Sequence, residues 1–178
     1  DDVERVLKEL DELLKRDETE VREVEKRHRE VLETIERRVR EVIERHKEML
    51  RRLAELVRSG GSEETLKEIL DRLRRTSEEL KKELEKILRD LERTSREVEE
   101  RSERTLREIE KRIEDLRRKG GDVEELKKVR DKVRRVIEES KRRLEELHEE
   151  IRRLITELKR RLEEVTEEIK RAIDELRR

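Results

Sequence analysis

Hydrophobic residues recur every three or four positions along nearly the whole chain, which is the spacing that places side chains on one face of an α-helix. Each stretch between turn signals carries a single stripe, made almost entirely of Leu, Ile and Val. The pattern predicts three helices, at about residues 2–58, 62–118 and 122–178. Because the spacing is helical throughout, the predicted fold class is all-α.

Two Gly-Gly pairs, at 60–61 and 120–121, contain the only glycines and divide the sequence into three segments of nearly equal length. Glycine can end a helix in the left-handed conformation at low steric cost, so each pair predicts a turn. A residue suited to cap the next helix, Ser62 or Asp122, follows each pair. The first and third helices also begin with the spacing of a capping box, Asp1 with Glu4 and Asp122 with Glu125.

Long helices joined by such short turns must lie antiparallel to one another. At a rise of 1.5 Å per residue, each helix is expected to be about 85 Å long. We therefore expect a single domain over residues 1–178. Its predicted architecture is an elongated, antiparallel up-down-up three-helix bundle, nearly straight or a weakly left-handed coiled coil.

The supply of hydrophobic residues matches what one such bundle needs. Three seams of this length require roughly 49 apolar positions, and 29% of the 178 residues are hydrophobic. A few residues beside the stripes widen the seams without forming a second apolar face. We therefore expect a monomer that requires no partner. The flanking residues are Val6, Leu13, Leu32, Ile43 and Leu50.

Polar residues interrupt the stripes at matching levels of the three helices. With these turns, facing residues of the first and second helices have numbers that add to about 120, and those of the first and third differ by about 120. The interruptions at 17, 28 and 46 then each meet hydroxyl or imidazole groups, which can donate and accept hydrogen bonds. We predict two buried polar layers: His28 with Thr94, Ser95 and His148, and His46 with Thr76, Ser77 and Thr166. The same counting gives a third polar layer, which is Asp17 with Ser102, Thr105 and Ser140, and with Thr19 at its margin.

A Thr-Ser pair occurs at two of these levels, at 76–77 and again at 94–95. The interval of eighteen residues makes five helical turns at 3.6 residues per turn, so both pairs lie on the same face. We expect each pair to straddle the seam, with one hydroxyl turned toward each neighbouring helix. Alternatively, the hydroxyls are solvated or bond to their own backbone carbonyls, and the histidines lie at the surface. Whether the Asp17 layer is buried stays open.

The charge composition excludes several classes of protein. Charged residues make up 59% of the chain, and 52 basic side chains are interspersed with 53 acidic ones. Balanced charge and periodic apolar residues disfavour disorder. A nucleic-acid-binding protein needs a basic stripe, and the sequence has none. The longest apolar runs are two residues, so we expect no membrane span and no targeting signal, with a cytoplasmic location only as the default.

The residues that could carry chemistry are not arranged for it. His28 and His148 could supply two zinc ligands, but a zinc site needs three or four donors and hydroxyls are poor substitutes. Asp17, Ser102 and His28 include the residue types of a catalytic triad, yet Asp17 and His28 lie about 16 Å apart along one helix. The sequence also has no cysteine and no glycine-rich phosphate loop. We expect no enzyme activity, no metal and no cofactor.

The whole chain resembles computationally designed three-helix bundles with buried hydrogen-bond networks. The resemblance is carried by equal helices, near-identical Gly-Gly turns, surfaces rich in Glu, Arg and Lys, and aliphatic seams interrupted by polar layers. Natural spectrin-like three-helix repeats are the second-best match, but they usually carry buried aromatic residues, and this chain has none. The resemblance implies a scaffold whose networks specify helix pairing and register. In some members of that class, buried histidines confer sensitivity to acid.

The sequence therefore predicts a structural scaffold. The alternative is an interaction module that binds a fourth helix in a groove, or whose helices pair with another copy of the chain. Sedimentation distinguishes these functions, because only self-association makes the apparent mass depend on protein concentration.

Overall fold

The structure is a computed structural model that describes the backbone of residues 2–177 and the side chains of residues 3–175. The predicted cap at Asp1 and the predicted helix end at 178 lie outside the described residues.

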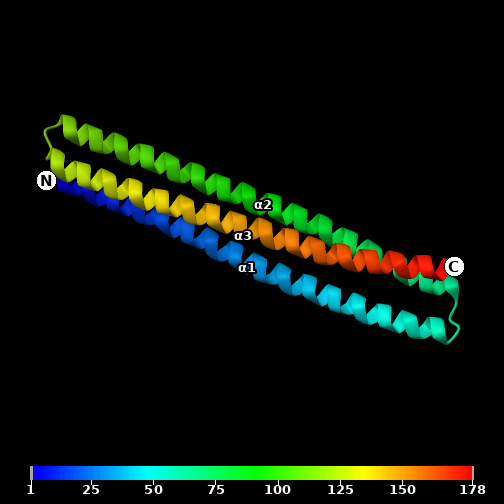
Figure 1. Cartoon of the computed structure of the whole chain (residues 1–178). Helices are drawn as coiled ribbons and strands as arrows, with labels where there is room; N and C mark the ends of the chain where they lie inside the picture. Colours follow the sequence, from blue (N-terminus) through cyan, green and yellow to red (C-terminus); the bar gives the residue numbers. More distant parts are fainter. Residues whose placement is uncertain (1, 178) are drawn as a thin grey trace. The chain divides into compact units, whose positions relative to one another are not determined.

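Three long helices make up almost all of the described chain (Figure 1). No strand occurs in residues 2–177, so the predicted all-α fold class is confirmed, as is the up-down-up order of a three-helix bundle. The second and third helices begin one residue later than predicted, because the capping residue before each is not itself helical. The helices are α1 (Asp2–Arg58), α2 (Glu63–Arg118) and α3 (Val123–Arg177).

Contacts divide the chain into two compact units, and each helix contributes one segment to each unit. Unit 1 consists of Asp1–Arg29 and Leu91–Glu150. Unit 2 consists of Glu30–Asp90 and Ile151–Arg178. The single domain over residues 1–178 stays a prediction, and the two units are described separately.

Ion pairs between α2 and α3 show how these helices are aligned in each unit. Their two residue numbers add to the same total in every pair, as antiparallel helices without a shift in register require. The pairs are Glu110–Arg134 at 2.6 Å and Glu103–Lys141 at 2.5 Å in unit 1, and Glu85–Lys159 at 3.0 Å and Lys81–Glu163 at 3.7 Å in unit 2.

Contacts from α1 follow the register predicted from the turns. Antiparallel contacts with α2 occur in both units, and parallel contacts with α3 occur in unit 1. The contacts with α2 are Glu9–Arg112 at 3.3 Å, Asp17–Ser102 at 2.7 Å and Glu20–Arg101 in unit 1, and Arg38–Glu83 at 2.5 Å in unit 2. Those with α3 are Glu25–Arg143 and Arg29–Glu150, both at 3.5 Å.

Each unit buries its own set of aliphatic side chains along the seams, and this burial is the main source of stability for a bundle without aromatic residues. In unit 1 the buried cluster near the second turn is Leu10, Leu14, Ile109, Ile113, Leu116, Leu126, Val133 and Ile137, and a smaller cluster is Val21, Val24, Val98 and Leu144. In unit 2 the most deeply buried residues are Val39, Leu66, Leu70, Leu84, Ile151, Ile155, Leu158, Leu162 and Ile169.

Besides Leu56, a predicted stripe residue that is 44% exposed, the buried stripe of α1 departs from the predicted one at two places in unit 2. Leu32 and Ile43, predicted only to flank the seam, are each 8% exposed, whereas the predicted stripe residues Val31 and Val42 are half-buried. Stepping by four residues at these places keeps the buried face close to 3.6 residues per turn. The sequence pattern alone offered two adjacent hydrophobic residues at each place and did not distinguish them.

The first connection ends α1 with a Schellman turn. Gly60 has a φ of 79°, the left-handed conformation that glycine adopts at low cost. The N–H of Gly61 donates to the carbonyl of Leu56 at 2.9 Å, and that of Gly60 donates to Val57 at 3.3 Å. The second connection repeats this pattern, with Gly120 at a φ of 87°.

The residue after each glycine pair begins the next helix. The carbonyls of Ser62 and Asp122 accept the first helical hydrogen bonds, from Leu66 at 3.2 Å and Leu126 at 3.0 Å. The carboxylate of Asp122 also accepts a hydrogen bond from the N–H of Glu124 at 3.0 Å. These contacts identify Ser62 and Asp122 as the helix-capping residues that the sequence predicted.

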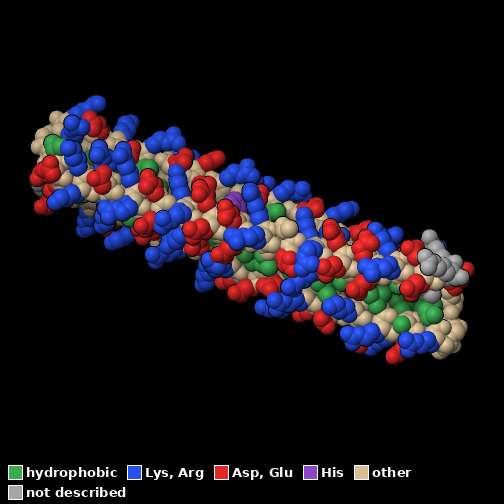
Figure 2. Space-filling model, in the orientation of Figure 1, with side chains coloured by type: hydrophobic (Ala, Val, Ile, Leu, Met, Phe, Trp, Pro, Cys, Tyr) green, Lys and Arg blue, Asp and Glu red, His purple; other side chains and the backbone are tan. Residues whose placement is uncertain are grey.

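Basic and acidic side chains are mixed over the visible face of the molecule (Figure 2). Many form ion pairs three or four residues apart on one helix, such as Arg52–Glu48 at 2.9 Å and Lys15–Asp11 at 3.2 Å. Exposed pairs of this kind stabilise a helix by only a few tenths of a kcal/mol each. Among the described residues, no helix is long and apolar enough to span a membrane.

Candidate functional site

In unit 2, a buried histidine on α1 faces a buried serine on α2. The Oγ atom of Ser77 lies 3.2 Å from Nδ1 of His46. His46 is 3% exposed and Ser77 is fully buried. The serine hydroxyl can donate to a bare Nδ1 or accept from a protonated one, so the contact suits either neutral tautomer. The structure therefore brings together the α1 and α2 members of the layer predicted at His46.

The two threonines predicted for the same layer bond to their own helices. Thr166 on α3 is buried, and its hydroxyl donates to the carbonyl of Leu162 at 2.8 Å. Thr76 on α2 is exposed, and its hydroxyl donates to the carbonyl of Arg72 at 3.0 Å. Bonding to the preceding turn satisfies a hydroxyl without any partner on another helix.

Only the serine of each Thr-Ser pair faces the core, so the expectation that both hydroxyls straddle the seam was wrong. Ser77 and Ser95 are buried, whereas Thr76 and Thr94 are exposed. Neighbouring residues on a helix are rotated by about 100°, so a serine that points into the core leaves the preceding threonine turned toward solvent. Thr76 and Thr94 are therefore not members of a buried layer.

In unit 1, His28 on α1 shares its level with residues of both other helices. His28 is 3% exposed and Ser95 is 1% exposed. His148 on α3 is half-buried, and its charge contributes to lowering the pKa of His28. The Nδ1 atom of His28 is buried and has no hydrogen-bond partner among the described residues. This level therefore buries His28 and Ser95 and leaves one nitrogen of His28 without a hydrogen bond.

Asp17 and Ser102 of the third predicted layer are buried, and the contact between them joins α1 to α2 in unit 1. Ser102 donates a hydrogen bond of 2.7 Å from Oγ to Oδ1 of Asp17. Asp17 is 5% exposed and Ser102 is 1% exposed. The second carboxylate oxygen of Asp17, Oδ2, is buried and has no hydrogen-bond partner in the described structure. A buried carboxylate with one donor is only partly compensated for its lost hydration.

The other residues predicted near Asp17 do not complete its hydrogen bonds. Ser140 on α3 is buried and Thr105 on α2 is half-buried, but neither donates to the orphan Oδ2. Thr19, predicted at the margin of the layer, is exposed and donates to the carbonyl of Lys15 at 2.8 Å. Spacing along the helices placed these hydroxyls at the right level but could not show where they point.

Burial shifts the pKa values of these core groups toward their neutral forms. Burial lowers the pKa of His46, and burial followed by the charge of His148 lowers that of His28. Burial also raises the pKa of Asp17, with smaller contributions from the neighbouring Glu20 and Glu18, while the hydrogen bond from Ser102 opposes the rise. Desolvation disfavours the charged form of both acids and bases, which accounts for the opposite directions.

Half-buried carboxylates beside the seam of unit 1 were not predicted. The side chain of Glu25 is 19% exposed and pairs with Arg143 at 3.5 Å. Burial raises the pKa of Glu99, with the charge of Glu145 adding to the rise and that of Lys141 opposing it. Both glutamates directly follow a buried valine, Val24 or Val98. The sequence could have indicated their partial burial, because each glutamate lies one residue after a residue of the hydrophobic stripe.

A groove of about 510 Å³ in unit 2 runs between α1 and α3. Its apolar lining is limited to Ile43 and Val165, and its remaining lining residues are charged and of both signs. A site that binds a small ligand usually combines an apolar pocket with a few convergent polar groups. Ligand binding therefore has little support from this groove.

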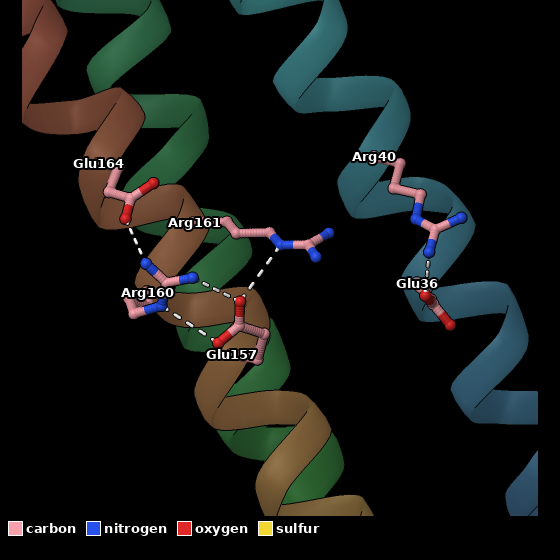
Figure 3. A network of polar contacts seen from close by, with 6 residues as sticks. All are labelled: Glu36, Arg40, Glu157, Arg160, Arg161 and Glu164. Atoms are coloured by element: carbon pink, nitrogen blue, oxygen red, sulfur yellow. Dashed lines mark hydrogen bonds and ion pairs between the residues drawn. The ribbon is translucent and has the colours of Figure 1, made fainter.

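Several of the charged residues around this groove pair on their own helix (Figure 3). Arg160 lies between two glutamates of α3, and Arg161 also reaches one of them. The contacts are Arg160 with Glu157 at 2.6 Å and with Glu164, Arg161 with Glu157 at 3.5 Å, and Arg40 with Glu36 at 2.5 Å.

Among the described residues, no group of three or more His, Cys, Asp or Glu side chains converges in a way that could hold a metal ion. The two histidines of the His28 level are fewer than the three or four donors that a zinc site requires.

Comparisons with known proteins identify the fold. No family model matches the chain, and no curated protein matches it. Among solved structures, a computationally designed three-helix bundle is similar over 98% of this chain and 88% of the other, with a TM-score of 0.50 and 20% sequence identity. The chain therefore has the three-helix fold of that designed protein.

Proposed function

We propose that the chain is a structural scaffold without catalytic activity or cofactor, in which buried polar residues specify how the helices pair. The contact between Ser77 and His46 carries this proposal, because it joins α1 to α2 inside an aliphatic core. Aliphatic side chains pack acceptably in several registers, whereas a shifted register leaves a buried hydroxyl and imidazole unpaired. An unpaired buried polar group costs about 1–3 kcal/mol, so the aligned register is favoured.

The Asp17–Ser102 hydrogen bond supports the same role in unit 1, since it also joins α1 to α2. The two contacts belong to different units, so each unit has its own polar pair to fix the alignment of these helices. Charged pairs at the helix surfaces add little selectivity, because they are exposed and screened by salt.

A designed origin is part of the proposal. Helices of nearly equal length, repeated glycine turns and a fold shared with a computationally designed bundle support it. So does the mixture of opposite charges over the surface, a pattern that designed proteins use for solubility.

Replacing the buried polar pairs with hydrophobic residues tests the scaffold role. The variant Asp17→Leu, Ser102→Ala, His46→Leu and Ser77→Ala should remain helical and become at least as stable toward guanidinium, because it removes both partners of each pair and leaves neither of them unpaired. Its amide NMR spectrum should show several sets of peaks, since registers that were disfavoured become accessible. A single sharp set, equal to that of the parent, would show that the polar pairs do not specify register.

Exposed threonines provide the matched control. The double variant Thr76→Ala and Thr94→Ala removes two hydroxyls next to Ser77 and Ser95, but from outside the core. It should retain one set of amide peaks. Multiple peaks in this control would assign the effect to general loss of polar residues rather than to the buried pairs.

Acid sensitivity is the second part of the proposal. His28 and His46 are buried, and burial lowers the pKa of each, so the unfolded chain binds protons before the folded chain does. Stability should fall as the pH decreases through the histidine range. Asp17 has the opposite shift, which limits the net response of unit 1.

A further inference from the structure

We propose that the apolar edge of unit 2 where α1 ends is a surface through which two copies of the chain associate. A groove of about 410 Å³ lies at this edge, between the last turns of α1, the first part of α2 and the last described residues of α3. Most of its lining is aliphatic: Leu50, Leu53, Ala54, Val57, Leu70 and Ala172, with Arg58 and Glu175 as the charged members.

Two exposed hydrophobic residues form one rim of this groove, which is called the ridge below. They are Val57, which also lines the groove and is 47% exposed, and its neighbour Leu56, which is 44% exposed; both belong to the last turn of α1. The third large exposed hydrophobic residue of the described chain, Val123, lies in unit 1. Figure 2 shows hydrophobic side chains at the surface near the ends of α1 and α3, where basic and acidic residues cover less of the molecule. Apolar surface of this kind marks an interaction site when it is contiguous.

A ridge next to a groove makes the surface complementary to itself. In a two-fold symmetric dimer, the ridge of one copy can occupy the groove of the other, and the reverse contact forms at the same time. The charged lining residues fit the same arrangement, because Arg58 and Glu175 have opposite signs and lie on different helices. Each copy thus presents a cation and an anion that can meet their opposites across the symmetry axis.

The net charge of the chain permits self-association, and the small number of exposed hydrophobic residues in the ridge makes the association weak. The formal net charge is −1 at pH 7, so two copies do not repel each other strongly. A stable dimer typically buries more than 1,000 Å² in total, about 500 Å² from each copy. Because the ridge contains only two exposed large hydrophobic residues, we expect a dissociation constant of about 0.1–1 mM. The chain is then a monomer at micromolar concentration.

The corresponding edge of unit 1 provides the contrast. Val123 there is 41% exposed, but the adjoining groove has a volume of only about 50 Å³. Charged residues make up most of its lining, with Glu110, Glu114, Arg117, Lys127 and Arg130 around the aliphatic members. This edge has an exposed hydrophobic residue without a groove to receive it, so it does not form a complementary surface.

Sedimentation equilibrium of the full chain between about 10 μM and 1 mM tests the proposal. The parent should change from monomer toward dimer across this range. Leu56→Glu with Val57→Glu should weaken association at least tenfold, because a charged ridge cannot enter an aliphatic groove. Val123→Glu, the matched control in unit 1, should associate like the parent. Circular dichroism confirms that each variant is helical.

Charge reversal tests the orientation of the two copies. Arg58→Glu or Glu175→Arg alone should weaken the dimer, and the double reversal should restore it, because each altered residue then meets its opposite. A parent that stays monomeric at 1 mM would overturn the proposal. So would association that is lost equally with Val123→Glu. Neither result bears on the scaffold role, because that role is tested by the number of amide peak sets of the monomer.

Discussion

Ser102 on α2 donates a hydrogen bond of 2.7 Å to Oδ1 of Asp17 on α1, while Oδ2 of the same carboxylate is buried without a partner. One oxygen of this side chain thus secures the contact between two helices, and the other carries an uncompensated desolvation cost. The contact therefore joins α1 to α2 in unit 1 and also carries a cost in stability.

Removing the charge of Asp17 should therefore stabilise the protein. In Asp17→Asn the amide oxygen can still accept from Ser102, and the cost of burying a carboxylate charge disappears. We expect a gain of about 1 kcal/mol near pH 7.5, measured as a higher guanidinium midpoint.

The gain should depend on pH with a defined sign. The folded pKa of Asp17 is raised above its model value of 3.8, so its neutral form is favoured in the folded state. The stability that protonation provides is complete below the unfolded pKa and is lost as the pH rises through the folded pKa. The difference between parent and Asp17→Asn should shrink toward zero below about pH 3.8. A constant difference at all pH values would argue against a buried, titrating carboxyl group.

Removing the hydroxyl of Ser77 should destabilise unit 2. Ser77→Ala leaves Nδ1 of His46 buried without its serine partner, so we expect a loss of about 1–2 kcal/mol. Thr76→Ala is the adjacent control, since its hydroxyl is exposed and bonds only to the carbonyl of Arg72. This change should stay within about 0.5 kcal/mol of the parent. Equal losses in the two variants would indicate that the contact with His46 contributes nothing measurable.

Acid should lower the stability of the parent more than that of a variant without histidines. The folded pKa values of His28 and His46 are lowered. The contribution of these histidines to the free energy of unfolding is therefore intact above the unfolded pKa of about 6.5 and declines as the pH falls through it. Below the folded pKa values the loss levels off. We expect the guanidinium midpoint to drop between about pH 7.5 and pH 5.

The comparison protein is the triple variant His28→Gln, His46→Gln and His148→Gln. Its midpoint should change less over the same range, because its remaining titrating groups are the carboxylates that the parent also has. An equal drop in the two proteins would assign the response to those carboxylates and would contradict the proposal that the histidines make the protein sensitive to acid.

The left-handed residue of each turn should resist substitution. Gly60 has open space around the position of a Cβ atom, so Gly60→Ala tests backbone strain alone, and we expect a loss of about 1–2 kcal/mol. Gly60→Asn should lose less, because asparagine tolerates this conformation better. Thermal unfolding measures both variants. If Gly60→Ala unfolds at the same temperature as the parent, the turn is not held in the left-handed conformation in solution.

The sequence predicted the helices and turns well because both depend on local rules. Hydrophobic spacing identified the three helices, and the glycine pairs marked their ends within one residue of where the structure has them. Levels counted from the turns also placed His46 beside Ser77 and Asp17 beside Ser102, since the rise per residue is constant along a helix.

Side-chain direction could not be predicted in the same way. Counting levels does not distinguish Ser77 from Thr76, because neighbours on a helix share a level but point about 100° apart. Adjacent hydrophobic residues raised the same difficulty at Leu32 and Ile43, which the structure buries in preference to the valines before them. The unpartnered atoms of Asp17 and His28 depend on rotamers, for which the sequence has no signal.

The polar positions of the His28 and His46 levels are eighteen residues apart in every helix: His28 and His46 on α1, Ser77 and Ser95 on α2, and His148 and Thr166 on α3. Five complete turns separate the members of each pair, so each helix returns to the same rotational phase. Adding or removing eighteen residues in all three helices would preserve the phase of every seam. Removing two would rotate each remaining segment by about 200°. The helices can therefore be lengthened or shortened in steps of five turns without changing which residues face the core.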